Sequence, residues 1–372
     1  MNRRTPFRLG LTLILSLAVA ACAETQPSVK TPAPSSSATA PQLAPSASAT
    51  SGGAGHAIEI SNLDALRNTA SQKLAAAPWK IVWSQDGQSF DTLAHGRDAS
   101  GNPLQIAELL SVPGLKSLGQ QQEASPLAFL DVSTDGHLLA QTQDAQTLAL
   151  VDITSGKQLQ TITPGYQITR AAFSPDGKQL ATASGDRIQV DLWDVASGQK
   201  TATFTGFQTA APVYGIQWGP DGKTLLWISR ELVQPMDVAS GEFGPELRHE
   251  DFVGAVALAP HGETLAVATA ATVQGQLVPA VKLWDAASGQ PKGVIQLFQS
   301  ASQAGLSFSP DGSVLAVAVG KNVQFYDLGT QKQVSSLNDL PDQVVALAFS
   351  PDGAYLLVTM GDGTLTLWAV PG

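Results

Sequence analysis

The chain has 372 residues, with 21 Lys and Arg against 31 Asp and Glu, which gives a formal net charge of −10. This balance excludes nucleic-acid binding through a basic face, because neutralising phosphates requires clustered Lys and Arg. The single Cys excludes an internal disulfide framework and a Cys-based metal site, and the five scattered His argue against a His-based metal centre. The high content of Gly (34) and Pro (23) favours many turns over long helices.

The first 21 residues have the pattern of an export signal. Arg3, Arg4 and Arg8 precede an apolar run from Leu9 to Ala21, which is too short to span about 30 Å of hydrocarbon as a helix. The run ends in Val-Ala-Ala followed by Cys22, which resembles the cleavage box of bacterial lipoproteins. That resemblance implies cleavage after residue 21, a lipid anchor on Cys22, and attachment to the cell membrane or outer membrane.

Two alternatives remain open at this junction. Ala21-Cys22-Ala23 also fits an ordinary secretion signal, in which cleavage after Ala23 discards Cys22 and releases a soluble protein. The apolar run is also compatible with an uncleaved anchor. The acidic surface would be repelled by anionic lipid, so we expect any membrane attachment to run through the anchor and not through a basic face.

Residues 22–55 are predicted to be a disordered tether. Ala, Pro, Ser, Thr and Gly fill 25 of the 30 positions from Gln26 to Gly55, so the segment cannot bury enough apolar surface to fold. Such a coil has a root-mean-square reach of roughly 30–40 Å. We expect it to hold the folded body away from the membrane.

From residue 80 onward the sequence repeats. Phe-Ser-Pro-Asp-Gly occurs three times, and weaker copies bring the total to seven, with closing glycines at 87, 136, 177, 222, 262, 312 and 353. In each copy Pro and Asp fit the first positions of a tight turn and Gly supplies a positive φ. A repeat of about 45 residues with four short strands is typical of a propeller blade.

The ends of the third strands make the resemblance more specific. Leu-Trp-Asp at 192–194 and 283–285, with relaxed versions in other copies, resembles the WD repeat. The Gly-His pair that opens many such repeats is absent, and Gly165-Tyr166 and Gly206-Phe207 stand near its place. The family's buried Asp-His-Ser-Trp network is therefore not expected in full, although Asp186 and Asp362 match its Asp.

Residues 56–372 are thus predicted to form an all-β, seven-bladed propeller. The last copy ends at Ala369-Val370 after its third strand, so it lacks a fourth. Residues 56–78 precede the first inner strand. We expect residues 56–70 to supply the missing outer strand, which would close the ring and leave no free edge.

The sequence offers no convincing catalytic set. The innermost strands from the second blade onward contain no His, and Asp131 and Arg170 are their only charges. No Gly-x-Ser-x-Gly elbow for a nucleophile and no pair of carboxylates with glycosidase spacing is evident. We therefore predict a chain without enzymatic activity, cofactor or metal.

Interaction with a protein is the favoured function. The Pro-Asp-Gly and Ser-Gly turns share one end of the ring (the turn face), so the variable loops gather at the other end (the loop face), together with the excursion Ala270–Pro279. Aromatic and Arg side chains on such a surface are hot-spot types. The candidate binding residues are Tyr166, Phe207, Tyr214, Arg230, Glu231, Phe252 and Asp342.

The sequence accordingly predicts a monomeric scaffold that presents its loop face to a protein partner at the cell envelope. The alternative is a propeller that binds a small molecule or glycan, or a degenerate enzyme, with the ligand in the central channel. A polar, convergent channel lining would favour the alternative. An apolar lining would favour the scaffold.

Overall fold

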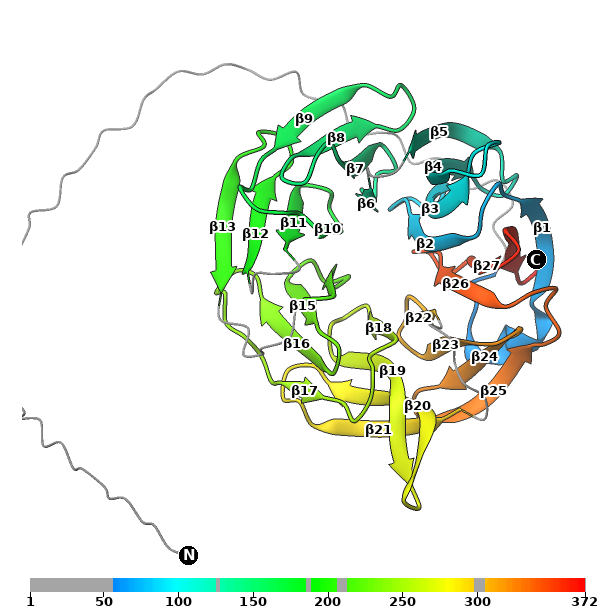
Figure 1. Cartoon of the computed structure of the whole chain (residues 1–372). Coiled ribbons are helices and arrows are strands. Elements are labelled where there is room, and N and C mark those ends of the chain that lie inside the picture. Colours follow the sequence, from blue (N-terminus) through cyan, green and yellow to red (C-terminus); the bar gives the residue numbers. More distant parts are fainter. Residues whose placement is uncertain (1–55, 125–127, 185–188, 206–212, 298–304, 372) are drawn as a thin grey trace, which may run out of the picture. The chain divides into compact units, whose positions relative to one another are not determined.

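The computed structural model describes residues 56–124, 128–184, 189–205, 213–297 and 305–371. The predicted signal and tether, including Cys22, lie outside these residues. Within them, 28 strands form seven sheets of four antiparallel strands each. The sheets are arranged as blades around a common axis (Figure 1), so the predicted all-β, seven-bladed propeller is confirmed.

The blades follow one another along the chain, each running from the inner to the outer strand. The first three are formed by β2 (Pro78–Trp83), β3 (Ser89–Arg97), β4 (Pro103–Ser111) and β5 (Ser117–Ala124); β6 (Phe129–Val132), β7 (Leu138–Thr142), β8 (Leu148–Asp152) and β9 (Gln158–Ile162); and β10 (Arg170–Phe173), β11 (Gln179–Ala183), β12 (Gln189–Asp194) and β13 (Lys200–Thr205).

The next three blades have the same order, with two local differences. They consist of β14 (Gly215–Trp218), β15 (Thr224–Ile228), β16 (Leu232–Asp237) and β17 (Leu247–Arg248); β18 (Ala255–Leu258), β19 (Thr264–Val273), β20 (Gln276–Asp285) and β21 (Pro291–Gln296); and β22 (Leu306–Phe308), β23 (Val314–Val319), β24 (Asn322–Asp327) and β25 (Lys332–Leu337). Blade 4 ends in a strand of only two residues. The long hairpin β19–β20, which contains the predicted excursion, extends outward from the ring in Figure 1.

Blade 7 is built from both ends of the folded body. Its inner strands are β26 (Val344–Phe349), β27 (Tyr355–Met360) and β28 (Thr364–Ala369), and its outer strand is β1 (Arg67–Lys73). β1 pairs with β28 from Arg67 opposite Ala369 to Lys73 opposite Thr364. The preceding residues form a bridge between His56 and Val370 and the 3-10 helix η1 (Ile60–Ala65). Strand β1 therefore begins at residue 67 instead of the expected residue 56, and it ends three residues after the expected end at residue 70.

The repeated turn has the same hydrogen bonds in several blades. In blade 3 the Ser174 hydroxyl donates to Asp176 Oδ1 at 2.7 Å and accepts the Gln179 amide at 2.9 Å. Gly177 takes a φ of +68°, a region that only Gly enters without cost. Blades 1, 2, 6 and 7 contain the same Ser–Asp pair. The motif therefore specifies the turn from inner to second strand by local chemistry alone.

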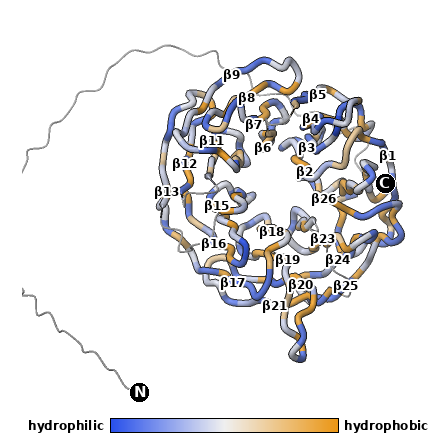
Figure 2. Tube along the Cα trace, viewed as in Figure 1, coloured by the Kyte–Doolittle hydropathy of each residue, from blue (hydrophilic) through white to orange (hydrophobic). Residues whose placement is uncertain are grey.

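The apolar core lies between blades, not at the centre of the ring. One cluster joins Val190 and Leu192 of blade 3 with Trp218 and Trp227 of blade 4, and others join further neighbouring blades. Figure 2 accordingly shows apolar segments in every blade. No helix in the described residues is long and apolar enough to cross a membrane.

Candidate interaction surfaces

Four of the predicted binding residues gather at the loop-face end of blade 4. Tyr214 precedes β14, Arg230 and Glu231 form the turn between β15 and β16, and Phe252 lies between β17 and β18. The Arg230 carbonyl accepts the Val253 amide at 2.9 Å, and the Glu231 carbonyl accepts the His249 amide at 2.8 Å. These bonds hold the two segments side by side. We call Tyr214, Arg230, Glu231 and Phe252 the blade 4 patch.

The blade 4 patch is accessible to a partner. Tyr214 is 46% exposed and Phe252 is 44% exposed, which is unusual for large aromatic side chains. Arg170 at the start of β10 extends the patch, because its Nε donates to the Tyr214 carbonyl. The patch thus combines two aromatic rings with Arg side chains on a hydrogen-bonded frame.

The remaining predicted residues do not join this patch. Asp342 is half-buried and precedes β26 in blade 7, away from blade 4 in the ring (Figure 1). Phe207 lies outside the described residues. Tyr166 was predicted as a surface residue, and this prediction is wrong because its side chain is only 3% exposed.

Tyr166 belongs to a buried hydrogen-bond network within blade 3. Its hydroxyl lies 2.9 Å from the hydroxyl of Thr182 on β11, which also accepts the indole N–H of Trp193 on β12 at 2.9 Å. A phenol is favoured here because its ring is apolar and its hydroxyl still finds partners. Tyr166 therefore stands where the Gly-His pair would place its His. Asp186, which matches the family's Asp, lies outside the described residues.

Sequence reasoning missed an exposed tryptophan on blade 1. Trp79 is 41% exposed and stacks on His95, with ring centroids 5.6 Å apart and planes at 15°. A hollow of about 510 Å³ beside His95 is also lined by Arg97 and Asp362. The one available signal was that Trp79 falls outside the repeated tryptophan positions.

Two opposite charges on inner strands, Asp131 and Lys80, are paired. Asp131 on β6 is buried and lies 2.7 Å from Lys80 Nζ on β2, and its oxygens accept the amides of Val132 and Phe173. Lys80 was not among the charges that the sequence analysis considered. In the described part of the chain, no three His, Cys, Asp or Glu side chains are grouped so that they could hold a metal ion.

His249 is buried beside the blade 4 patch. Its ring packs edge-on against Trp284, with centroids 5.7 Å apart. Burial and the neighbouring Lys282 lower the pKa of His249 to about 4. The imidazole is therefore uncharged at neutral pH, and it packs rather than contacting solvent.

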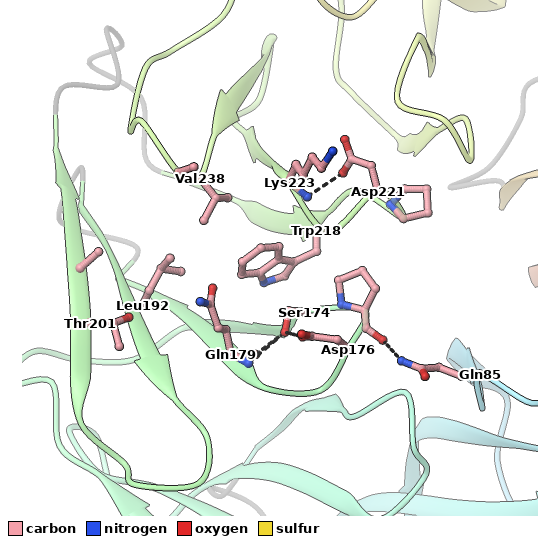
Figure 3. A pocket seen from close by; sticks show the side chains of 15 residues that line it. Gln85, Ser174, Asp176, Gln179, Leu192, Thr201, Trp218, Asp221, Lys223 and Val238 are labelled. Atoms are coloured by element: carbon pink, nitrogen blue, oxygen red, sulfur yellow. Dashed lines mark hydrogen bonds between the residues drawn. The ribbon is translucent and has the colours of Figure 1, made fainter. Parts of the chain in front are cut away.

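A groove opens on the turn face between blades 3 and 4 (Figure 3). It has a volume of about 720 Å³ and lies between the turn at Asp176 and the turn at Asp221. The ring of Trp218 lies between these turns, with Leu192 and Thr201 on the blade 3 side and Val238 on the blade 4 side. The groove also reaches Pro175, whose carbonyl accepts a hydrogen bond from the side-chain amide of Gln85 at 2.5 Å.

Comparison with known families identifies two repeats. The model of the WD domain, G-beta repeat, matches residues 156–188 and 331–369. The first matched segment begins with β9, the outer strand of blade 2, and continues into blade 3 with β10. The second begins with β25, the outer strand of blade 6, and continues into blade 7 with β26. A comparison with curated proteins found no match.

Proposed function

Because two segments of this seven-bladed propeller are WD repeats, we propose that the chain is a non-enzymatic interaction scaffold, monomeric and lipid-anchored at the cell envelope. In this proposal Cys22 carries the lipid, residues 22–55 form the tether, and the propeller presents its loop face to a protein partner. WD-repeat propellers commonly mediate protein interactions. The envelope location is supported by the signal-like residues 1–21 and the cleavage box at Cys22.

The blade 4 patch is the observation that carries the scaffold proposal. Large aromatic side chains and Arg dominate binding energy at protein interfaces. Here Tyr214 and Phe252 expose nearly half of their surface, beside Arg230. The inner strands favour a scaffold over a channel ligand, since Asp131 is already paired with Lys80.

The chain enters the propeller on the turn face. Ile58 donates its amide to the carbonyl of Gly353, the closing residue of the blade 7 turn, at 2.8 Å. His56 also bridges to Val370 at the end of the same blade. A partner that binds the loop face would therefore not meet the point where the tether joins.

The anchor is tested by intact mass of the protein purified from its native membrane, beside a Cys22→Ala variant. We expect a mature chain that begins at residue 22 and carries acyl chains, and we expect both the cleavage and the acylation to be absent from the variant. A chain that begins at residue 24 without lipid would contradict the anchor and support ordinary secretion.

The interaction surface is tested by crosslinking in intact cells. We expect a Tyr214→Ala, Phe252→Ala double variant to lose at least tenfold of a specific crosslinked species, because each aromatic contributes roughly 2 kcal/mol or more at a hot spot. A double variant at exposed outer-strand residues, Leu118→Ala with Leu159→Ala, serves as the matched control. Equal crosslinking of all three proteins would exclude the patch as the binding surface.

A further inference from the structure

We propose that His249 makes the blade 4 patch sensitive to acid: when the buried imidazole takes up a proton, residues 249–253 detach from the propeller and displace Phe252 from the patch. We call residues 249–253 the patch loop. The inference rests on the proposed function, because the patch is the surface that the loop completes. It adds a condition, acidity, under which a bound partner is released.

The side chain of His249 is buried without hydrogen bonds. It is 6% exposed, and neither ring nitrogen has a hydrogen-bond partner among the described residues. The indole N–H of Trp284, against which the imidazole packs, is likewise unpaired in this part of the chain. A protonated imidazole carries two N–H donors and a positive charge. The site has no acceptor for either donor, so protonation of the closed loop is unfavourable.

A comparison of blades 3 and 5 explains the missing partners. Three positions of blade 5 correspond in strand register to three positions of blade 3: Val267 to Thr182, Lys282 to Asp191, and Trp284 to Trp193. In blade 3 the Thr182 hydroxyl accepts the indole N–H of Trp193 at 2.9 Å. Val267 has no hydroxyl to do the same in blade 5. Blade 5 also has a cation at the position where blade 3 has a carboxylate.

The charge that acts on His249 is that of Lys282. The side chain of Lys282 on β20 is only 13% exposed. Burial of the imidazole, together with this ammonium group, lowers the pKa of His249 to about 4. Glu250 does not offset the effect, because its carboxylate lies 3.8 Å from Lys282 Nζ and accepts the hydroxyl of Thr272.

The other charged groups around the loop are engaged elsewhere. Arg248 on β17 is paired with Glu246, and the carboxylate of Asp251 accepts the amide of Phe252. Arg230 and Glu231, in the turn between β15 and β16, hold the loop through their backbone carbonyls. Strands β18 and β19 contain no charged residue.

The patch loop follows the shortest outer strand of the ring. β17 has two residues and pairs with β16 at two positions, whereas the other outer strands have at least five residues. Segments with few backbone hydrogen bonds open at a lower free energy than the rest of a fold. The loop itself depends on the bonds from the His249 and Val253 amides to Glu231 and Arg230. Opening therefore breaks the frame of the patch.

The direction of the pH effect follows from the two states of His249. In the open loop the imidazole has its usual pKa of 6.5, and in the closed loop the pKa is about 4. Between these values the open loop binds a proton that the closed loop does not, so opening becomes more favourable as pH falls. These two pKa values raise the opening constant about twentyfold from pH 7 to pH 5.

The test is hydrogen exchange of the purified full chain at pH 7 and pH 5, read by mass spectrometry on peptides that cover the patch loop. After correction for intrinsic exchange rates, we expect the protection of the loop amides to fall about twentyfold at pH 5. His249→Phe keeps an aromatic ring against Trp284 but cannot be protonated, so its loop should be equally protected at both pH values. His261→Phe replaces an exposed His of the same blade and should behave like the wild type.

Two results would overturn the proposal: a wild-type loop that keeps its protection at pH 5, or a His249→Phe loop that loses as much protection as the wild type. A thermal midpoint at pH 7 equal to that of the wild type shows that the variant is folded. If His249→Phe lacks that midpoint, His249→Gln, which is also unable to titrate in this range, takes its place in the same comparison.

Exchange is measured without a partner, so its result is separate from the crosslinking test of the blade 4 patch. A patch that the Tyr214→Ala, Phe252→Ala variant disables, together with a loop that stays closed at pH 5, would refute the acid response and leave the patch. A loop that opens at pH 5, together with unchanged crosslinking of that variant, would refute the patch and leave the acid-induced opening.

Discussion

At the residue scale, the seven copies place different side chains in equivalent positions, and these differences carry the local chemistry. Asp91 follows Phe90 on β3, and four other blades have Ala in the corresponding place: Ala140, Ala181, Ala266 and Ala316. Asp91 is only 1% exposed, and neither carboxyl oxygen has a hydrogen-bond partner among the described residues. A buried polar group without a partner costs free energy of folding.

This position makes stability depend on pH. Burial, together with the carboxylates of Asp135 and Asp131, raises the pKa of Asp91 well above its usual 3.8. Above pH 3.8 the unfolded chain releases this proton while the folded chain retains it. The free energy of unfolding therefore falls as pH rises, by at most about 1.4 kcal/mol per pH unit, until the pKa of the folded state is reached.

We expect Asp91→Ala to be more stable than the wild type at neutral pH, with a difference that grows between pH 4 and pH 7. Urea unfolding at a series of pH values measures it. Asp194→Asn is the matched control, and we expect its effect on stability to change with pH in the opposite direction. The hydroxyl and backbone amide of Ser197 donate to Asp194 and lower its pKa. The ionised Asp194 therefore adds to the free energy of unfolding above pH 3.8, and this stabilisation is lost as pH falls. Asp194→Asn should be less stable than the wild type at neutral pH only. A difference for Asp91→Ala that does not change with pH would contradict the assignment.

Tyr166 shows why residue roles were harder to predict than turns. Its place near the missing Gly-His pair could be read from the sequence, but an aromatic residue in a loop suits both a surface and a core position. The choice depends on Thr182 and Trp193, which lie on two other strands and meet Tyr166 only in the folded blade.

At the element scale, strand β1 decides whether the ring is closed. It covers the edge of β28, and the Thr69 hydroxyl donates to the Leu367 carbonyl at 3.1 Å. Lys73 Nζ lies 2.6 Å from Asp362 at the other end of the strand. The segment before β1 also buries Ile58, Leu63 and Leu66 against blades 6 and 7. Each buried aliphatic side chain contributes about 1.5–3 kcal/mol.

Removing this segment should therefore cost several kcal/mol, which is comparable with the total stability of a typical domain. We expect a chain that starts at Ala75 to unfold at a midpoint at least roughly 10 °C lower than the full chain, or to aggregate through the bare edge of β28. A chain that starts at His56 retains these contacts and is the control. Differential scanning calorimetry of the three chains measures the effect, and equal midpoints would refute the role of β1.

At the scale of the whole molecule, the ring has two ends with different construction. The turn face repeats one hydrogen-bonded design, in which Asp accepts from Ser at Asp152, Asp194, Asp237 and Asp285. On the loop face, Asp98, Asp144 and Asp362 each accept the amide two residues later, between the second and third strands of blades 1, 2 and 7. The exposed side chains Trp79, Tyr214 and Phe252 are found at this same end. Local hydrogen bonds specify the turns at the turn face, so the fold does not depend on the exposed loop-face side chains that form the blade 4 patch.

The sequence by itself determined the strand count, the turns and the number of blades, because each depends on residues close together in the chain. Ser174, Asp176 and Gly177 specify their turn with local hydrogen bonds and one positive φ. The tertiary structure alone decided which side chains are exposed, since burial depends on neighbours contributed by other strands and blades. It placed Tyr166 in the core, gathered the blade 4 patch from separate loops, and left a groove beside Trp218. The groove arises where adjacent blades pack, whereas the position of Tyr166 and the blade 4 patch depend on segments that meet only in the folded blade. Contacts of both kinds leave no local pattern in the sequence.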